Sequence, residues 1–196
     1  MCLLSTDYIS DARNFQRCGE YELAIMSLNR AREVDKQKKN GVEIEKLLSF
    51  NYRKLKQFDL ALFHINNAIK DAKLACNLAH DKQTKNDYAI CLMNKGIIYE
   101  TINATDKVEA CYLPALEIFI DLFDATPEHY GIIINALLTI GMFYYNQHKY
   151  AQAEEFLEKA LPYFGDSQAK DRDRRYLAIT NTLSDIKNKR KAVDSI

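Results

Sequence analysis

The sequence contains few of the residues that interrupt helices. Only 6 glycines and 3 prolines occur among 196 residues, and the glycines are scattered. Scarce turn-forming residues favour long helices over many short strands, and scattered glycines do not make a phosphate-binding loop. No segment approaches the roughly 18 consecutive apolar residues that a membrane-spanning helix needs. The sequence therefore predicts a helical protein without a membrane span.

The chain also lacks a charge excess and paired cysteines. Its 27 basic and 27 acidic residues give a formal net charge of zero, whereas a dedicated nucleic-acid-binding protein usually carries a basic excess. The five cysteines have no close partner in the sequence, although zinc and redox motifs need local pairs. We therefore expect small, buried cysteine side chains in a reducing, cytoplasmic location, with no metal and no cofactor.

Groups that could perform catalysis are dispersed along the chain. A catalytic site needs convergent polar groups, such as a nucleophile beside a base or paired carboxylates. The four histidines fall in separate segments of the sequence: His64, His80, His129 and His148. The sequence therefore predicts no catalytic residue, and we expect that the protein is not an enzyme.

One pattern occurs four times without an internal gap. Each copy begins with a small anchor residue and has an aromatic residue three positions later: Ala12 and Phe15, Ser49 and Tyr52, Gly96 and Tyr99, Gly141 and Tyr144. Nine positions after the anchors stand Tyr21, Phe58, Thr105 and Tyr150. Twelve and nineteen positions after them stand Ala24 and Ala31, Ala61 and Ala68, Val108 and Ala115, Ala153 and Ala160. Apolar residues between these columns recur at helical spacing, which predicts two packed helices in each copy.

These columns resemble the tetratricopeptide repeat, a helix–turn–helix unit with small and aromatic residues at fixed positions. The resemblance covers about nine-tenths of the chain and implies an all-α, right-handed superhelical solenoid of antiparallel helix pairs. The anchors lie 37, 47 and 45 residues apart, more than the usual repeat length of about 34, and the closing proline is mostly absent. Longer helices occur in kinesin-light-chain-like repeats, which residues 115–141 resemble, and in bacterial peptide-sensing or signalling proteins.

The predicted organisation is four helix pairs within residues 1–167, followed by one more helix. The pairs span about 5–36, 42–79, 82–123 and 127–164. Residues 168–196 form either a terminal capping helix or the first half of a fifth repeat. In this last segment Ser184 occupies the small-residue column but Lys187 occupies the aromatic column, which favours the cap because terminal repeats need a polar outer face.

The resemblance also implies a concave groove, lined by the first helix of each pair, that binds a protein partner as an extended peptide or a helix. In the third and fourth copies we expect the groove residues Met93, Asn94, Ile97, Asn135, Leu138 and Met142. The earlier copies contribute a more basic set, Arg13, Lys46, Phe50 and Arg53, which favours an acidic partner. Kinesin-light-chain-like repeats carry groove asparagines that bind a peptide backbone. Asn94 matches that position, and Asn135 lies one turn earlier.

Other interpretations of the sequence remain open. The chain could be a sensor or scaffold part of a larger signalling or transcription-regulatory protein. The basic segment 187–191 could attach the protein to nucleic acid or an anionic surface, although short basic helix ends usually complement the helix dipole. The last helix carries a stripe of Tyr176, Ile179 and Leu183 that could mediate self-association.

Overall fold

The computed structural model describes residues 4–37, 39–79, 81–165 and 173–193. Those residues form nine α-helices and two short 3₁₀ helices, and they contain no strand. The chain divides into two compact units, Met1–Ala115 and Leu116–Ile196, and the boundary falls inside the sixth helix. The all-helical architecture expected from the sequence is therefore confirmed.

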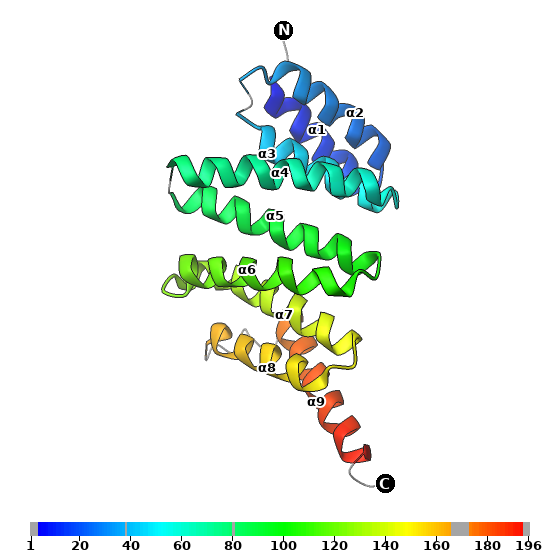
Figure 1. Ribbon diagram of the computed structural model, residues 1–196, viewed down its shortest axis with the longest axis vertical. Helices are drawn as coiled ribbons and strands as arrows, with labels where there is room; N and C mark the ends of the chain where they lie inside the picture. Colours follow the sequence, from blue (N-terminus) through cyan, green and yellow to red (C-terminus); the bar gives the residue numbers. More distant parts are fainter. Residues whose placement is uncertain (1–3, 38, 80, 166–172, 194–196) are drawn as a thin grey trace. The chain divides into compact units, whose positions relative to one another are not determined.

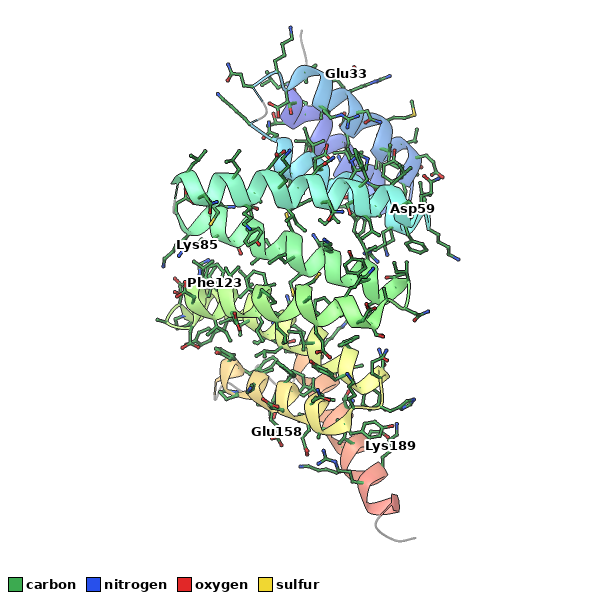
Figure 2. All side chains as sticks on the ribbon, viewed as in Figure 1. Glu33, Asp59, Lys85, Phe123, Glu158 and Lys189 are labelled. Carbon is green, nitrogen blue, oxygen red and sulfur yellow. The ribbon has the colours of Figure 1, made fainter. Side chains whose placement is uncertain are left out.

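The first unit contains two complete helix pairs and most of a third. Helix α1 (Ser5–Cys18) packs against α2 (Tyr21–Val34), and α3 (Gly41–Lys54) packs against α4 (Phe58–Ala79). Helix α5 (Lys82–Thr101) packs against α4, and α6 (Thr105–Phe123) begins in this unit. Asp59 and Lys85 mark the starts of the antiparallel helices α4 and α5, at opposite ends of that pair (Figures 1 and 2).

The second unit contains the end of α6 and the last helices. A 3₁₀ turn, η1 (Pro127–His129), leads into α7 (Tyr130–Asn146), which packs against α8 (Tyr150–Ala160). A second 3₁₀ turn, η2 (Leu161–Phe164), ends that pair. Helix α9 (Arg174–Val193) packs against both α7 and α8. We call α1, α3, α5 and α7, which carry the anchors, the first helices, and their partners α2, α4, α6 and α8 the second helices.

The repeated columns form the core of each helix pair. The alanine and valine positions of the second helices have no exposed surface in any copy, and the four anchors are buried as well. A further column, sixteen positions after the anchor, is bulky and fully buried: Leu28, Ile65, Tyr112 and Leu157. Small residues therefore let two helices approach, and one large side chain per pair fills the space beside the anchor.

The two glycine anchors show how closely the helices approach. A Cβ atom added at Gly96 would lie 2.3 Å from Cε1 of Tyr112, and one added at Gly141 would lie 2.6 Å from Cδ2 of Leu157. Distances this short leave no room for a side chain unless the buried partner moves. Ser49, the anchor of the second pair, instead donates a hydrogen bond of 2.8 Å to the carbonyl oxygen of Ala61.

Each first helix ends in the same left-handed turn, seven positions after its anchor. The residues with positive φ are Gly19 (79°), Lys56 (59°), Asn103 (58°) and His148 (58°). The next N–H bonds to the carbonyl of the aromatic column in every copy, at 2.8–3.0 Å. These bonds define a Schellman motif, which satisfies the free carbonyls of a helix end. Four identical turns place the second helices in a constant register.

Candidate interaction face

The ten predicted groove residues are divided between the two units. Seven lie on the first helices of the first unit: Arg13 on α1; Lys46, Phe50 and Arg53 on α3; Met93, Asn94 and Ile97 on α5. The other three, Asn135, Leu138 and Met142, lie on α7 in the second unit. Each group is therefore described within its own unit.

A row of charged side chains connects the first helices of the first unit. Arg13 Nη2 lies 2.8 Å from Oε1 of Glu43, and Lys46 Nζ lies 2.9 Å from the other oxygen of that carboxylate. Lys46 Nζ also lies 3.0 Å from Asp87 Oδ1 on α5. The row thus runs from α1 through α3 to α5, and two of the predicted basic residues already have acidic partners within the fold.

Burial and ion pairing shift the pKa values of the residues in this row in opposite directions. Burial raises the pKa of Glu43, but the hydrogen bonds and charges of Lys46 and Arg13 together hold that pKa below its ordinary value. Burial likewise lowers the pKa of Lys46, and Glu43 and Asp87 outweigh it, so that the pKa of Lys46 is raised. Both groups are therefore ionised at neutral pH, and the side chain of Lys46 is only 12% exposed.

Phe50 and Arg53 also lie on α3, but there the cations contact an aromatic ring instead of carboxylates. The Phe50 ring is 36% exposed, with the guanidinium of Arg53 and the ammonium of Lys54 each 5.5 Å from its centroid. The Tyr21 ring meets it edge-on, with 6.4 Å between centroids. Arg53 is half-buried. These residues therefore present an aromatic surface flanked by two cations.

On α5 the structure separates the three predicted residues. Asn94 and Ile97 are half-buried, and the Asn94 amide makes no hydrogen bond to any described residue. Met93 is buried, with 9% of its surface exposed. Its position three residues before the anchor is also that of Ile9 and Lys46, which are buried or nearly so. Met93 is therefore corrected to a packing residue, because its own side chain is buried, whereas Leu138 at the same position of the fourth copy is half-buried.

In the second unit the predicted residues lie beside α9. The Arg175 guanidinium on α9 donates to Oδ1 of Asn135 at 3.4 Å and to the carbonyl of Gly131 at 3.3 Å. The hydroxyl of Thr182 lies 3.7 Å from the sulfur of Met142, and Leu138 is half-buried. Further along, the Tyr145 hydroxyl donates to Asp185 and accepts from Lys189, which Figure 2 labels. Much of this face of α7 is therefore in contact with α9.

The stripe predicted for self-association is corrected by the structure. Ile179 has no exposed surface and Leu183 only 7%, because α9 packs with them against its own unit, and the Tyr176 ring lies edge-on to Phe164. The exposed positions are instead mostly polar: Arg174, Leu177, Asn181, Ser184, Lys187 and Asn188. Such a polar outer face is what the capping interpretation expects.

The basic segment at the end of α9 is partly neutralised within the second unit. Lys189 Nζ lies 3.0 Å from Asp185 Oδ2, and Arg190 forms an ion pair with Glu154 on α8. Lys187 is exposed, and the side chain of Lys191 lies outside the described residues. This pairing reduces the charge that would be available for a phosphate backbone.

The histidines and cysteines do not form a reactive cluster among the described residues. His64 is buried, with Nδ1 2.8 Å from Oε2 of Glu45 and its ring stacked on Tyr52. Burial raises the pKa of the Cys91 thiol to about 12, which keeps it protonated and unreactive at neutral pH. Cys18 is exposed, contrary to the expected burial, while Cys2 and His80 lie outside the described residues. The described part of the chain has no group of three metal-ligating side chains.

The cavities found in the first unit lie away from the predicted residues. A cavity of about 450 Å³ is lined by residues of α2, α3, α4 and the α2–α3 connection: Arg32, Asp35, Lys36, Gly41, Ile44, Glu45, Asn67, Lys70 and Asp71. It brings basic and acidic side chains together without an excess of either. None of the described helices combines the length and apolar character needed to cross a lipid bilayer.

Sequence signals explain which interaction residues were found and which were missed. Lys46 was predicted but its partner Glu43 was not, although the two are oppositely charged residues three apart on one helix. Asp87 and Arg175 were missed, because each lies about 40 residues from its partner and no periodic pattern connects them.

Comparison with known proteins supports the fold. No protein-family profile matches the sequence, and no curated protein is detectably similar to it. The structure is similar to the apo form of RapI, with a TM-score of 0.75 and 17% identity over 97% of this chain and 65% of RapI. This chain therefore spans slightly less than two thirds of RapI.

Two further solved structures are similar over most of both chains. One contains the tetratricopeptide-like repeats of a putative kinesin light chain from Podosopora anserina, with a TM-score of 0.72, 12% identity, and coverage of 100% of this chain and 93% of that one. The other is BtubC (BKLC) from P. vanneervenii, with a TM-score of 0.65, 18% identity, and coverage of 94% and 79%. The chain therefore has a tetratricopeptide-repeat-like fold, an all-helical solenoid of antiparallel helix pairs.

Proposed function

We propose that the protein is a non-enzymatic interaction module that binds a partner protein, as an extended segment or a helix, along its first helices. The observation that carries this proposal is the surface formed by Phe50, Arg53, Asn94 and Ile97 in the first unit. These side chains are at least partly exposed. Neither Arg53 nor Asn94 has a hydrogen-bond partner among the described residues. An amide offers both a donor and an acceptor, which suits the backbone of an extended peptide.

The remaining predicted residues have a lesser role in this proposal. Arg13 and Lys46 are already paired with Glu43 and Asp87, so they stabilise the fold and shape the face. Asn135 and Met142 contact α9, which leaves them less surface for a partner. We therefore assign the partner chiefly to the first unit.

A second candidate function is a sensor or scaffold part of a longer protein. The similarity to RapI favours it, because the matched region is 65% of that chain. We also propose a cytoplasmic location, since the four described cysteines are free thiols and free thiols persist in reducing compartments. Nucleic-acid attachment through α9 is less well supported, because Lys189 and Arg190 have acidic partners.

The proposal is tested by capturing partners from a lysate of the source cell. Wild type is compared with the double variant Asn94→Ala/Ile97→Glu, and captured proteins are identified by mass spectrometry at low and high salt. The matched control is Gln152→Ala/Glu158→Gln, which changes exposed residues of α8. All variants are first shown to unfold at the wild-type temperature.

We expect a partner that wild type and the control retain and the double variant loses. Equal capture by all three proteins would contradict the assignment to the first helices. Recovery of nucleic acid alone, in a salt-sensitive manner, would favour the basic helix instead.

A further inference from the structure

The cations on the first helices of the first unit differ in whether a carboxylate neutralises their charge. Arg13 and Lys46 have carboxylate partners within 3.0 Å. Arg53 lies about two turns after Lys46 on α3. It has neither a hydrogen bond nor an ion pair with any described residue. The residue is half-buried, and its positive charge has no acidic partner among the described residues. A cation that no carboxylate neutralises, on the same helix as neutralised ones, is a suitable position for an anionic ligand.

The surroundings of Arg53 are aromatic rather than acidic. Phe50 lies beneath the guanidinium, Lys54 approaches the same ring, and Tyr21 closes one side. Burial lowers the pKa of Arg53, but an arginine remains protonated at neutral pH. The site thus offers a permanent positive charge beside an exposed apolar ring.

We propose that Arg53, Lys54 and Phe50 form a subsite for an acidic residue of the partner segment. The side-chain carboxylate of an aspartate or glutamate accepts hydrogen bonds from the Arg53 guanidinium, and an apolar side chain next to it packs on the Phe50 ring. This inference rests on the proposed function, and it specifies the chemistry of the partner. The partner is a protein segment that combines an acidic residue with an apolar neighbour.

Two observations favour a carboxylate over a polyanion. The neighbouring cations of the same face are neutralised by Glu43 and Asp87, and the chain has no net charge. The free positive charge is therefore local and suits one anionic group, whereas a nucleic acid presents a charge about every 1.7 Å and binds extended basic surfaces. A planar guanidinium also matches the two oxygens of a carboxylate, so two parallel hydrogen bonds can form.

The experiment is a selection of binding peptides on the full chain. A phage library that displays random twelve-residue peptides is selected on wild type, on Arg53→Gln and on the control Arg30→Gln. Arg30 is an exposed arginine on α2, so its replacement removes the same charge from the same unit. Enriched peptides are then synthesised with free and with amidated C-termini, and their affinities are measured by fluorescence anisotropy.

We expect wild type and Arg30→Gln to select peptides with an acidic residue beside an apolar one, and Arg53→Gln to lose the acidic preference. Binding of the selected acidic peptide by Arg53→Gln should be weaker by about tenfold or more, the usual effect of losing a charge-assisted hydrogen bond. Binding of the same peptide with glutamine in place of the acid should be insensitive to Arg53→Gln. Amidation of the C-terminus should change none of these affinities.

Four results would overturn the inference, and they have different consequences for the proposed function. Peptides enriched without an acidic preference, or an acidic preference that survives in Arg53→Gln, would reject the subsite while leaving peptide binding in place. Loss of binding on amidation would assign the anion to a terminal carboxylate instead of a side chain. Failure of wild type to enrich any peptide would reject both proposals.

Discussion

The two units are built from similar helix pairs but differ in the polar contacts that their first helices make. In the first unit, α1, α3 and α5 are linked through Arg13, Glu43, Lys46 and Asp87. In the second unit, α9 packs beside α7 through side chains that are buried and apolar: Ile179, Leu183 and Ile186. A polar cluster of Tyr145, Asp185 and Lys189 completes that contact.

This difference shows which positions of the repeat must stay constant. The columns that pack a first helix on its own second helix are small or bulky in the same order in every copy. The positions between the columns differ from copy to copy, and the one three residues before the anchor is Ile9, Lys46, Met93 or Leu138. The side chains at these intermediate positions can therefore change without altering the core of the pair. Substitutions at four kinds of position test this comparison.

The largest effect is expected at the glycine anchors, one of which lies in each unit. Gly96→Leu and Gly141→Leu should each lower the free energy of unfolding by more than about 2 kcal/mol, because the new side chain meets buried Tyr112 or Leu157. Chemical denaturation measures the change. Gly131→Ala is the control, since its Cβ meets only the end of the Arg175 side chain at 3.2 Å. Wild-type stability in either leucine variant would contradict the assigned column.

The ionic row of the first unit should give the next largest effect. Lys46→Met leaves Glu43 and Asp87 partly buried without their shared cation, and we expect a loss of about 1–3 kcal/mol. Tyr145→Phe is the matched change in the second unit and should cost less, because its partners Asp185 and Lys189 are more exposed than Glu43 and Asp87. Equal losses from the two variants would remove the proposed difference between the units.

The pH dependence of Lys46→Met makes that prediction more specific. The pKa of Glu43 lies below its ordinary value of 4.5. The stabilisation from this carboxylate is therefore present above pH 4.5 and is lost as the pH falls through the lower pKa of the folded state. The difference between wild type and Lys46→Met should accordingly shrink on acidification. A difference that grows below pH 4 would contradict the assigned pair.

A smaller effect, of opposite sign, is expected at the left-handed turns. Lys56→Gly should raise the free energy of unfolding by about 0.5–1 kcal/mol, because glycine adopts positive φ without the cost that a side chain adds. His148→Gly in the second unit should gain less, since His148 also contacts the hydroxyl of Tyr150. Gly19→Ala should destabilise the first pair by a similar amount. Thermal unfolding of the three variants compares these turns directly.

The smallest effect on stability is expected at Asn94. Asn94→Ala removes an amide that has no hydrogen-bond partner among the described residues, so the free energy of unfolding should change by no more than about 0.5 kcal/mol. A loss above 1 kcal/mol would mean that the amide serves the fold, and it would withdraw Asn94 from the proposed interaction face.

Much of the fold was predictable because burial follows spacing. The anchor and alanine columns recur at constant intervals in the sequence, and in the structure these positions are buried in all four copies. The interaction face was less predictable. Met93 was placed on it because it stands between columns, yet that position is packed. Spacing identifies the side of a helix that meets its own partner, and it contains no information about the neighbouring pair.

The sequence by itself determined the helix pairs, since each copy carries its small, aromatic and alanine positions locally and a helical period brings them onto one face. Only the tertiary structure decided the turns and the charges. Lys56, Asn103 and His148 share no side-chain property, and each takes a left-handed conformation because the two packed helices require it. Lys46 and Asp87 are 41 residues apart, so packing of α3 and α5 determines that this cation is neutralised, whereas Arg53 has no acidic partner among the described residues.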